Sequence, residues 1–380
     1  MLLLKKIWPV FITAVISCVV TAMLTFVFTT AYNASISKEM KFRIIDGYLE
    51  NVYFGDYDKN KAMEQAYKGY VASLGDPYTE YFTAEDLKSF NSFIDNSYCG
   101  IGVAVRNDVE KDAIVVEDVF DNSPAKEAGI EHGDIIKKVE GKEYKGSQLD
   151  EAVSFIKGEE GSEVKITIVK ASTGKEQEIS LQRRNVVANT VEAEFMDGNI
   201  GYIYISQFGN KTAEEFATKL DEFMNKKIKG LVVDVRANPG GITTAVEAVA
   251  SCLLPKDTVI YYTSDKAGNK NYIKTKMEGV DIPLVVLADG NSVSAAEILV
   301  GAIKDHGRGT VVGTKTYGKG VVQTLIDLDN GTALKVTIEK YYTPNGNYIH
   351  GKGIEPDYYV EYGGETDTQL EKAIEILKNQ

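Results

Sequence analysis

The stretch SVSAAEILVGAIKDHGRGTVVGTKTYGKGVVQ, residues 292–323, carries most of the information about the fold and chemistry of this chain. Turn-forming residues at 289–291 follow the apolar run 283–288, and apolar residues between 295 and 303 then recur at helical spacing. We therefore expect Ser294 where a strand gives way to a helix. The first N–H groups of a helix have no partner inside it, and the helix dipole adds partial positive charge, so a developing oxyanion can be stabilised there.

Ser294 has two explanations at this junction. It, or Ser292, can be a helix N-cap, which is the commonest use of a serine in such a position. Alternatively, Ser294 is a nucleophile, and the small side chain of Ala295 lets a substrate carbonyl reach the backbone N–H that follows. The local sequence leaves both explanations open.

A nucleophilic serine needs a base, and Lys319 is a candidate because it lies between two glycines, where a solvated surface lysine is unusual. A lysine can act as a base when burial or neighbouring groups hold it neutral. Gln323 can orient the amine without adding charge. Residues four apart in a straight strand are separated by roughly 13 Å, so the chain must bend if Lys319 and Gln323 are to touch.

Residues 313–320 also nearly match the phosphate-binding loop G-x-x-x-x-G-K-[ST]. The match fails at Gly320, which replaces the hydroxyl residue that would bind magnesium. Residues 321–326 resemble a strand and not the helix that such a loop requires. The sequence therefore argues against nucleotide binding.

Three further motifs accompany Ser294 and Lys319: LGDPYT at 74–79, DVRANPGG at 234–241 and GKGIEPD at 351–357. Together they resemble the carboxyl-terminal processing peptidases, the tail-specific serine proteases that use a Ser/Lys dyad. The motifs span nearly all of the chain beyond its N-terminus, so the resemblance is specific.

The resemblance implies that Ser294 is the nucleophile, Lys319 the general base and Gln323 its orienting partner. It also implies an oxyanion hole formed by the N–H groups of Ala295 and Gly240, with Gly241 as a close rival. No metal or cofactor is implied. The family usually shows SASASE where this chain has SVSAAE at 292–297, a difference that leaves the nucleophile in place.

Residues 97–184 contain short strands and turns whose order resembles a PDZ domain. The carboxylate-binding loop would be Gly100, Ile101 and Gly102, followed by Val103 on the strand that pairs with a peptide. Exposed N–H groups at a glycine-rich turn bind an anion, and a free strand edge accepts an extended peptide. Ile101, Val103, Val153 and Ile156 would form the apolar pocket for the last side chain of a protein substrate.

Residues 185–363 alternate strands and helices, which predicts an α/β core, and the resemblance makes it a crotonase-like β-β-α serine protease core with the PDZ domain inserted before it. Residues 35–96 have helical periodicity, and residues 364–380 include a final amphipathic helix. By resemblance, the N-terminal helical arm helps to form a homodimer.

Residues 7–32 form an almost uninterrupted apolar run without a charge, preceded by Lys5 and Lys6. This length is sufficient for a bilayer, and the lysines favour a cytoplasmic N-terminus. We expect residues 1–34 to be a cytoplasmic stub and an uncleaved single-pass transmembrane anchor, with the catalytic domain extracytoplasmic. A cleaved signal peptide is the alternative, although the run is long and no A-x-A site follows it.

Composition limits the remaining possibilities. A chain of 380 residues with 44% hydrophobic content can form two or three domains. Its net charge of -13 argues against a nucleic-acid partner. Three cysteines are too few for a disulfide framework, and the three histidines lack metal-ligand spacing.

We therefore expect a membrane-anchored serine endopeptidase that recognises substrate C-termini through its PDZ domain and cleaves with a Ser294/Lys319 dyad. By resemblance, the PDZ domain is also expected to gate the dyad. The competing hypothesis is a catalytically inactive PDZ scaffold at the membrane.

Overall fold

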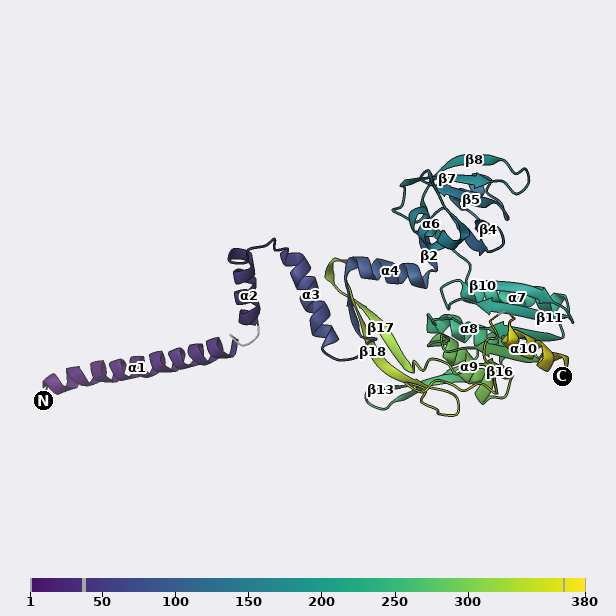
Figure 1. Cartoon of the computed structure of the whole chain (residues 1–380). Helices are drawn as coiled ribbons and strands as arrows, with labels where there is room; N and C mark the ends of the chain where they lie inside the picture. The colour runs from purple at the N-terminus through teal and green to yellow at the C-terminus, as the bar shows by residue number, and fades with distance from the viewer. Residues whose placement is uncertain (1, 36–38, 365, 380) are drawn as a thin grey trace. The chain divides into compact units, whose positions relative to one another are not determined.

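The computed structural model describes residues 2–35, 39–364 and 366–379, and divides the chain into two compact units, Met1–Pro77 and Tyr78–Gln380. The first unit contains three helices (Figure 1): α1 Leu2–Ser35, α2 Glu39–Asn51 and α3 Lys59–Ala72. The Asp58 side chain caps α3 by accepting a hydrogen bond from the N–H of Lys61. The helices predicted before residue 74 are thus confirmed.

No helix in the described part of the chain meets both the length and the apolarity that a bilayer span requires.

The second unit begins with a strand that the helical prediction for 35–96 missed. Residues Glu80–Phe82 form β1, and Ala84–Ile94 then form helix α4. The side chains of Thr83 and Asp86 cap α4 reciprocally, which gives the chain a sharp change of direction. Helical periodicity did not show β1 because a strand of three residues is too short to produce a pattern of its own.

The PDZ-like part contains an antiparallel sheet with strand order β3-β4-β5-β7-β8, and β6 pairs with β5. Its core is built from alternating apolar residues such as Ile114, Val116, Ile136 and Ile168. The short strands β2 and β9 pair where the chain enters and leaves this sheet. The elements are β2 Ser97–Gly100, β3 Val103–Asp108, β4 Ala113–Val119, α5 Pro124–Glu127, β5 Ile135–Val139, β6 Lys142–Glu143, the 3-10 helix Gly146–Gln148, α6 Leu149–Ile156, β7 Glu163–Val169, β8 Glu176–Gln182 and β9 Arg184–Val187.

The α/β part is organised around a six-stranded sheet with order β10-β11-β12-β15-β16-β19, in which all pairs except β10–β11 are parallel. The central strands β12 and β15 are buried along their whole length because helices cover both faces. Its elements are β10 Val191–Met196, β11 Ile200–Ile205, α7 Thr212–Asn225, β12 Gly230–Asp234, α8 Thr243–Leu253, β15 Leu284–Ala288, α9 Ala295–Asp305, β16 Thr310–Gly313, β19 Tyr358–Tyr359 and α10 Thr368–Lys378.

Alternate residues of the central strands face two different cores. Leu231 and Val286 join the cluster that contains α7, α8 and α9, whereas Val232 and Val285 pack with Ala373 and Leu377 of α10. The predicted C-terminal helix is therefore confirmed as α10, and it covers the second face of the sheet.

Arg236 fixes α10 to the end of β12. Its guanidinium donates to Asp234, Asp367 and Gln369. Burial alone would raise the pKa of Asp367, but the hydrogen bonds from Arg236 and from the first turn of α10 outweigh it and lower that pKa below the ordinary value. The ion pair therefore stabilises the docked helix at neutral pH.

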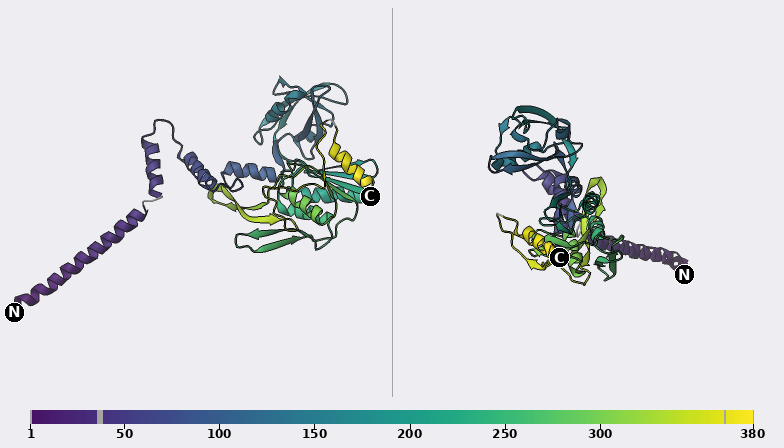
Figure 2. Two further views of the ribbon diagram at one scale, coloured as in Figure 1. Left: turned by 60° about the horizontal axis from the view of Figure 1, so that its bottom comes forward. Right: turned by 90° about the vertical axis from the view of Figure 1, so that its right-hand side faces the viewer.

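A second, antiparallel sheet has the order β1-β18-β13-β14, with β17 also paired to β18. Its strands are β13 Val259–Asp265, β14 Lys270–Lys274, β17 Val321–Asp327 and β18 Ala333–Tyr342, with a 3-10 turn at Asp329–Gly331. Strands β17 and β18 form a long hairpin (Figure 2) that turns at Asn330 and Gly331. Lys319 lies just before β17, so this hairpin determines where the candidate base can be.

Candidate active site

Ser294 lies at the junction between β15 and α9, as predicted, and has the backbone angles φ 57° and ψ −111°. Such a conformation costs a non-glycine residue about 1–3 kcal/mol. Hydrogen bonds hold it: the N–H of Ser294 donates to Glu297 Oε2 at 2.9 Å, and its carbonyl accepts from the Tyr341 hydroxyl at 3.1 Å. Strain that the surroundings enforce is typical of functional positions.

Ser292 has a different environment from Ser294. It is fully buried, its hydroxyl donates to the carbonyl of Val235 at 2.8 Å, and it accepts from the N–H of Asp289 at 2.9 Å. These bonds close the turn between β15 and α9. Ser292 is therefore a structural residue, which leaves Ser294 as the serine that lines the cavity.

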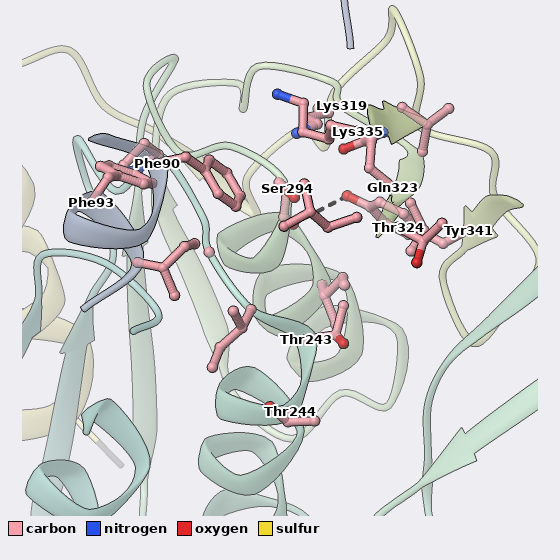
Figure 3. A pocket seen from close by; sticks show the side chains of 18 residues that line it. Phe90, Phe93, Thr243, Thr244, Ser294, Lys319, Gln323, Thr324, Lys335 and Tyr341 are labelled. Carbon is pink, nitrogen blue, oxygen red and sulfur yellow. Dashed lines mark hydrogen bonds between the residues drawn. The ribbon is translucent and has the colours of Figure 1, made fainter. Parts of the chain in front are cut away.

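A cavity of about 400 Å³ contains the three residues predicted to act together, Ser294, Lys319 and Gln323 (Figure 3). They come from α9, from the loop before β17 and from β17. Most of the remaining lining is apolar or hydroxyl-bearing: Phe90, Phe93, Ile94, Pro239, Ile242, Thr243, Thr244, Ile298, Val321, Val322, Thr324, Leu325 and Tyr341. The cavity thus offers an apolar surface to a peptide next to the candidate nucleophile.

The chain departs from straight-strand geometry at Gly318, before Lys319, and again just before Gln323. Gly318 has φ +95°, and a side chain there would lie within 3 Å of the backbone of Lys352 and Gly353. The register of β17 against β18 then shifts between Val322 and Gln323. Only glycine tolerates this close approach in that conformation.

Ser294 and Lys319, the candidate dyad, line the same cavity but are not hydrogen-bonded to each other in the described chain. Among the described residues, neither Ser294 nor Gln323 forms a hydrogen bond with Lys319. The Gln323 amide donates to Thr337 Oγ1 at 3.2 Å, and Lys319 Nζ lies 4.8 Å from the centre of the Tyr78 ring.

The loop at 238–241 packs directly against Ser294. A Cβ on Gly240 would lie 2.7 Å from the carbonyl oxygen of Val293 and 2.8 Å from Ser294 Cβ. The N–H of Gly240 donates to Asn238 Oδ1 at 2.8 Å, whereas the rival Gly241 lines the cavity. Within the residues described, the N–H groups of Ala295 and Gly241 have no hydrogen-bond acceptor.

Glu297 connects the two candidate catalytic loops. This fully buried carboxylate accepts four hydrogen bonds: from the N–H of Ser294 at 2.9 Å, and from Thr316 Oγ1 at 2.6 Å, Gly318 N at 2.7 Å and Lys319 N at 2.8 Å. It therefore sets the separation of the Ser294 and Lys319 backbones. Sequence reasoning assigned it no role, although a glutamate in an otherwise apolar helix turn was a usable signal.

The predicted peptide-binding residues of the PDZ-like part also come together. Ile101 is buried, and Gly102 has φ +81° where a Cβ would lie 2.2 Å from Ser123 Cβ. Strand β3, which begins at Val103, is at the edge of its sheet. A groove of about 370 Å³ runs beside it, lined by the four predicted residues Ile101, Val103, Val153 and Ile156 together with Tyr98, Ala104, Val105, Phe120, Leu149, Asp150 and Lys157.

Other reactive side chains are less suited to catalysis. Burial raises the pKa of the Cys99 and Cys252 thiols, which makes them poor nucleophiles. His350 Nδ1 accepts a hydrogen bond from the N–H of Gly320 at 3.3 Å, so His350 contacts the loop that carries Lys319. Within the described residues it forms no hydrogen bond with Ser294. Residues Val321–Asp327 form strand β17, as predicted, and not the helix that would follow a phosphate-binding loop.

We expect Glu297→Gln to destabilise the protein and to slow the labelling of Ser294 by a fluorophosphonate probe by at least tenfold. Glutamine has one acceptor oxygen, and its NH₂ group would face N–H donors, so buried donors lose their acceptor at a cost of about 1–3 kcal/mol each. Thermal unfolding and the labelling rate are the measurements. Glu247→Gln is the matched control because its oxygen can still accept from Tyr261; equal effects of the two variants would contradict the connecting role of Glu297.

Comparison with known proteins agrees with this geometry. Residues 199–360 match Peptidase family S41, and residues 92–169 match the PDZ domain. The chain is 36% identical to the carboxy-terminal processing protease CtpB of Bacillus subtilis (strain 168), over 87% of this chain and 70% of that protein. It is 34% identical to CtpA of the same strain, over 99% of this chain and 84% of that protein.

A solved structure, a photosystem II D1 C-terminal processing protease, aligns with a TM-score of 0.52 and 27% identity, over 88% of this chain and 90% of the other. These similarities decide between the peptidase and the inactive PDZ scaffold. The chain belongs to peptidase family S41, and it is a PDZ-containing, serine-type carboxyl-terminal processing protease.

Proposed function

We propose that this peptidase cleaves its substrates with Ser294 as nucleophile and Lys319 as general base, and that Gln323 orients the amine. The observation that carries the proposal is the meeting of these three residues in one apolar cavity, with Ser294 held in a strained conformation. Lys319 must approach Ser294 before the dyad can work, and Gln323 can accept from the amine through Oε1 while its Nε2 donates to Thr337.

The reaction follows from the roles of these groups. Lys319 in its neutral form takes the Ser294 hydroxyl proton while Oγ bonds to the scissile carbonyl carbon. The resulting ammonium gives a proton to the leaving amine as the C–N bond breaks, which leaves an acyl-enzyme. Water then attacks this ester, and Lys319 takes a proton from the water and gives it to Ser294 Oγ as the C–O bond breaks, so that the acyl part leaves as a carboxylic acid.

The oxyanion that forms in each step needs two donors. The N–H of Ala295 at the start of α9 is one, and it has no competing acceptor within the described chain. Gly241 is the better placed second donor, because the N–H of Gly240 is already donated to Asn238. Gly240 would need to turn away from Asn238 to serve, so it remains the alternative.

The cavity that Lys319 lines contains a second amine. Lys335 lines the same cavity, and a second ammonium group in a partly buried space disfavours another positive charge. Lys335 forms an ion pair of 2.8 Å with Glu80.

Substrate recognition is proposed to begin at the PDZ groove. A C-terminal carboxylate would bind the N–H groups of the loop at 100–102, and the peptide would extend the sheet at β3. The apolar groove lining favours an apolar last residue. We also propose that peptide docking gates the dyad, which is consistent with the unlinked Ser294 and Lys319 of this structure; a PDZ domain crosslinked in one position should then stop turnover.

The crotonase-like β-β-α character of the core and the N-terminal anchor are proposals as well. The parallel sheet with α7, α8 and α9 on one face supports the first. The second rests on the uncharged run 7–32 and on the exposed large apolar side chains of α1 between residues 15 and 28. A single-pass anchor would leave the catalytic part extracytoplasmic, and the helical arm would form a homodimer.

Replacing either dyad member should abolish cleavage of an unstructured protein that has an apolar C-terminus. We expect Ser294→Ala and Lys319→Ala in the full chain to lose at least 10³-fold in kcat/KM, since neither the nucleophile nor its base can be replaced by water. The wild-type rate should rise with pH as the amine deprotonates. Lys304→Ala is the control; retained activity in the Lys319 variant would mean that another group is the base.

Val153→Asp should weaken the binding of a peptide with an apolar C-terminus by at least tenfold, because it buries a charge in the PDZ groove. Fluorescence anisotropy with a labelled peptide measures the change in Kd. Val109→Asp is the control because Val109 is 82% exposed. Amidating the peptide should have a similar effect to Val153→Asp, and equal binding of free and amidated peptides would contradict the carboxylate loop.

The full chain should stay with membranes after alkaline carbonate extraction, and removal of residues 1–34 should release it. The reason is the transfer of an uncharged run of some two dozen residues into the bilayer. Mass spectrometry of the N-terminus separates an uncleaved anchor from a cleaved signal peptide. Light scattering of the detergent-solubilised chain reports the dimer, and a released full-length chain would overturn the anchor.

A further inference from the structure

Tyr78 is held firmly beside the loop that carries Lys319. The residue after it, Thr79, accepts a hydrogen bond from the N–H of Thr337 at 3.0 Å. Strand β1 then pairs with β18 in the register Glu80 to Lys335. Tyr78 is thus fixed to the same hairpin whose other strand follows Lys319.

The Tyr78 ring is also supported from the side. It packs edge-on against His350 with the ring centres 5.9 Å apart, and His350 accepts the hydrogen bond from Gly320, the neighbour of Lys319. Lys319 Nζ lies 4.8 Å from the centre of the Tyr78 ring. The ring and the candidate base are therefore positioned by one connected set of contacts.

The face of an aromatic ring attracts a cation and has no comparable attraction for a neutral amine. At this distance the contact favours the ammonium form of Lys319 by about two- to thirtyfold in equilibrium. The ammonium form cannot accept the Ser294 proton. No hydrogen bond joins Ser294 and Lys319 in the described chain, so the contact with Tyr78 coincides with an unlinked dyad.

We propose that Tyr78 is a positioning residue of this active site. Its ring holds the protonated Lys319 side chain in a resting place away from Ser294, and the amine must leave the ring before it can act as a base. This inference rests on the proposed role of Lys319. It adds a side chain that holds the proposed base in its resting position. This side chain, Tyr78, lies just before strand β1 and not in the PDZ-like part.

Other charged and titratable groups near Lys319 also bear on its charge. Glu297 lies under the backbone of residues 318–319, and Lys335 lines the same cavity with its ion pair to Glu80. The remaining groups are His350 at Gly320 and the buried hydroxyl of Tyr341. Substitution of Tyr78 leaves all of these charged and titratable groups in the chain. Their effect on the charge of Lys319 is therefore the same in the wild type and in the Tyr78 variants.

The test is the pH dependence of Ser294 labelling by a fluorophosphonate in the full chain, for wild type, Tyr78→Phe, Tyr78→Leu and Tyr78→Trp. Tyr78→Leu should move the midpoint of the rising limb down by about 0.3–1.5 units and speed labelling by about two- to thirtyfold below the midpoint. Tyr78→Phe keeps the ring and should restore the wild-type midpoint. Tyr78→Trp offers a stronger cation site and should move the midpoint up.

Tyr358→Leu is the matched control, because Lys372 lies 5.2 Å from the Tyr358 ring in a similar contact away from the cavity. An unchanged midpoint in both Tyr78→Leu and Tyr78→Trp would overturn the proposal, as would a shift in Tyr78→Phe equal to that in Tyr78→Leu. Because the Leu and Trp variants are expected to shift in opposite directions, general destabilisation cannot imitate the result. If Lys319→Ala keeps the wild-type pH profile, Lys319 is not the base. That result would overturn the proposed function of Lys319 as well as the role of Tyr78.

Discussion

The buried carboxylate of Glu297 is the interaction on which the active site depends. A charge in this position is stable only because four donors satisfy it, and three of them are backbone N–H groups of Ser294, Gly318 and Lys319. The same bonds hold Ser294 in a conformation that a non-glycine residue would otherwise avoid. Ser294 and Lys319, the proposed nucleophile and base, are therefore placed through their backbone N–H groups, and these bonds do not involve the lysine side chain.

The two sheets explain how distant parts of the sequence reach this carboxylate. The parallel sheet buries β15 on both faces and ends it at the turn that presents Ser294. The antiparallel sheet brings the β17–β18 hairpin alongside, and β1 extends the same sheet with the segment after Tyr78. The site thus combines the end of β15 in the parallel sheet with β17, and the loop before it, in the antiparallel sheet.

The sequence identified the candidate residues of the site but not the contacts that hold them. Ser294, Lys319 and Gln323 were identifiable because their types and the glycines around them fit one chemistry, and the α/β periodicity placed Ser294 at a strand–helix junction. The role of Glu297 was not predictable, because it depends on hydrogen-bond donors that lie 19 to 22 residues away along the chain. Strand β1 was missed for a related reason: its three residues are strand only because β18 pairs with them.

The position of Lys319 shows why a Ser/Lys site can require a resting state. A lysine is charged in water near neutral pH, and the base must be neutral, so the protein has to supply an environment that changes between the two forms. An aromatic ring next to the cavity stabilises the charged form, while a second ammonium in the cavity stabilises the neutral one. A short movement of one flexible side chain between these two environments would change its charge and its reach together. Substrate binding that favours the cavity position would then switch on the nucleophile without rearranging the loops that Glu297 holds in place.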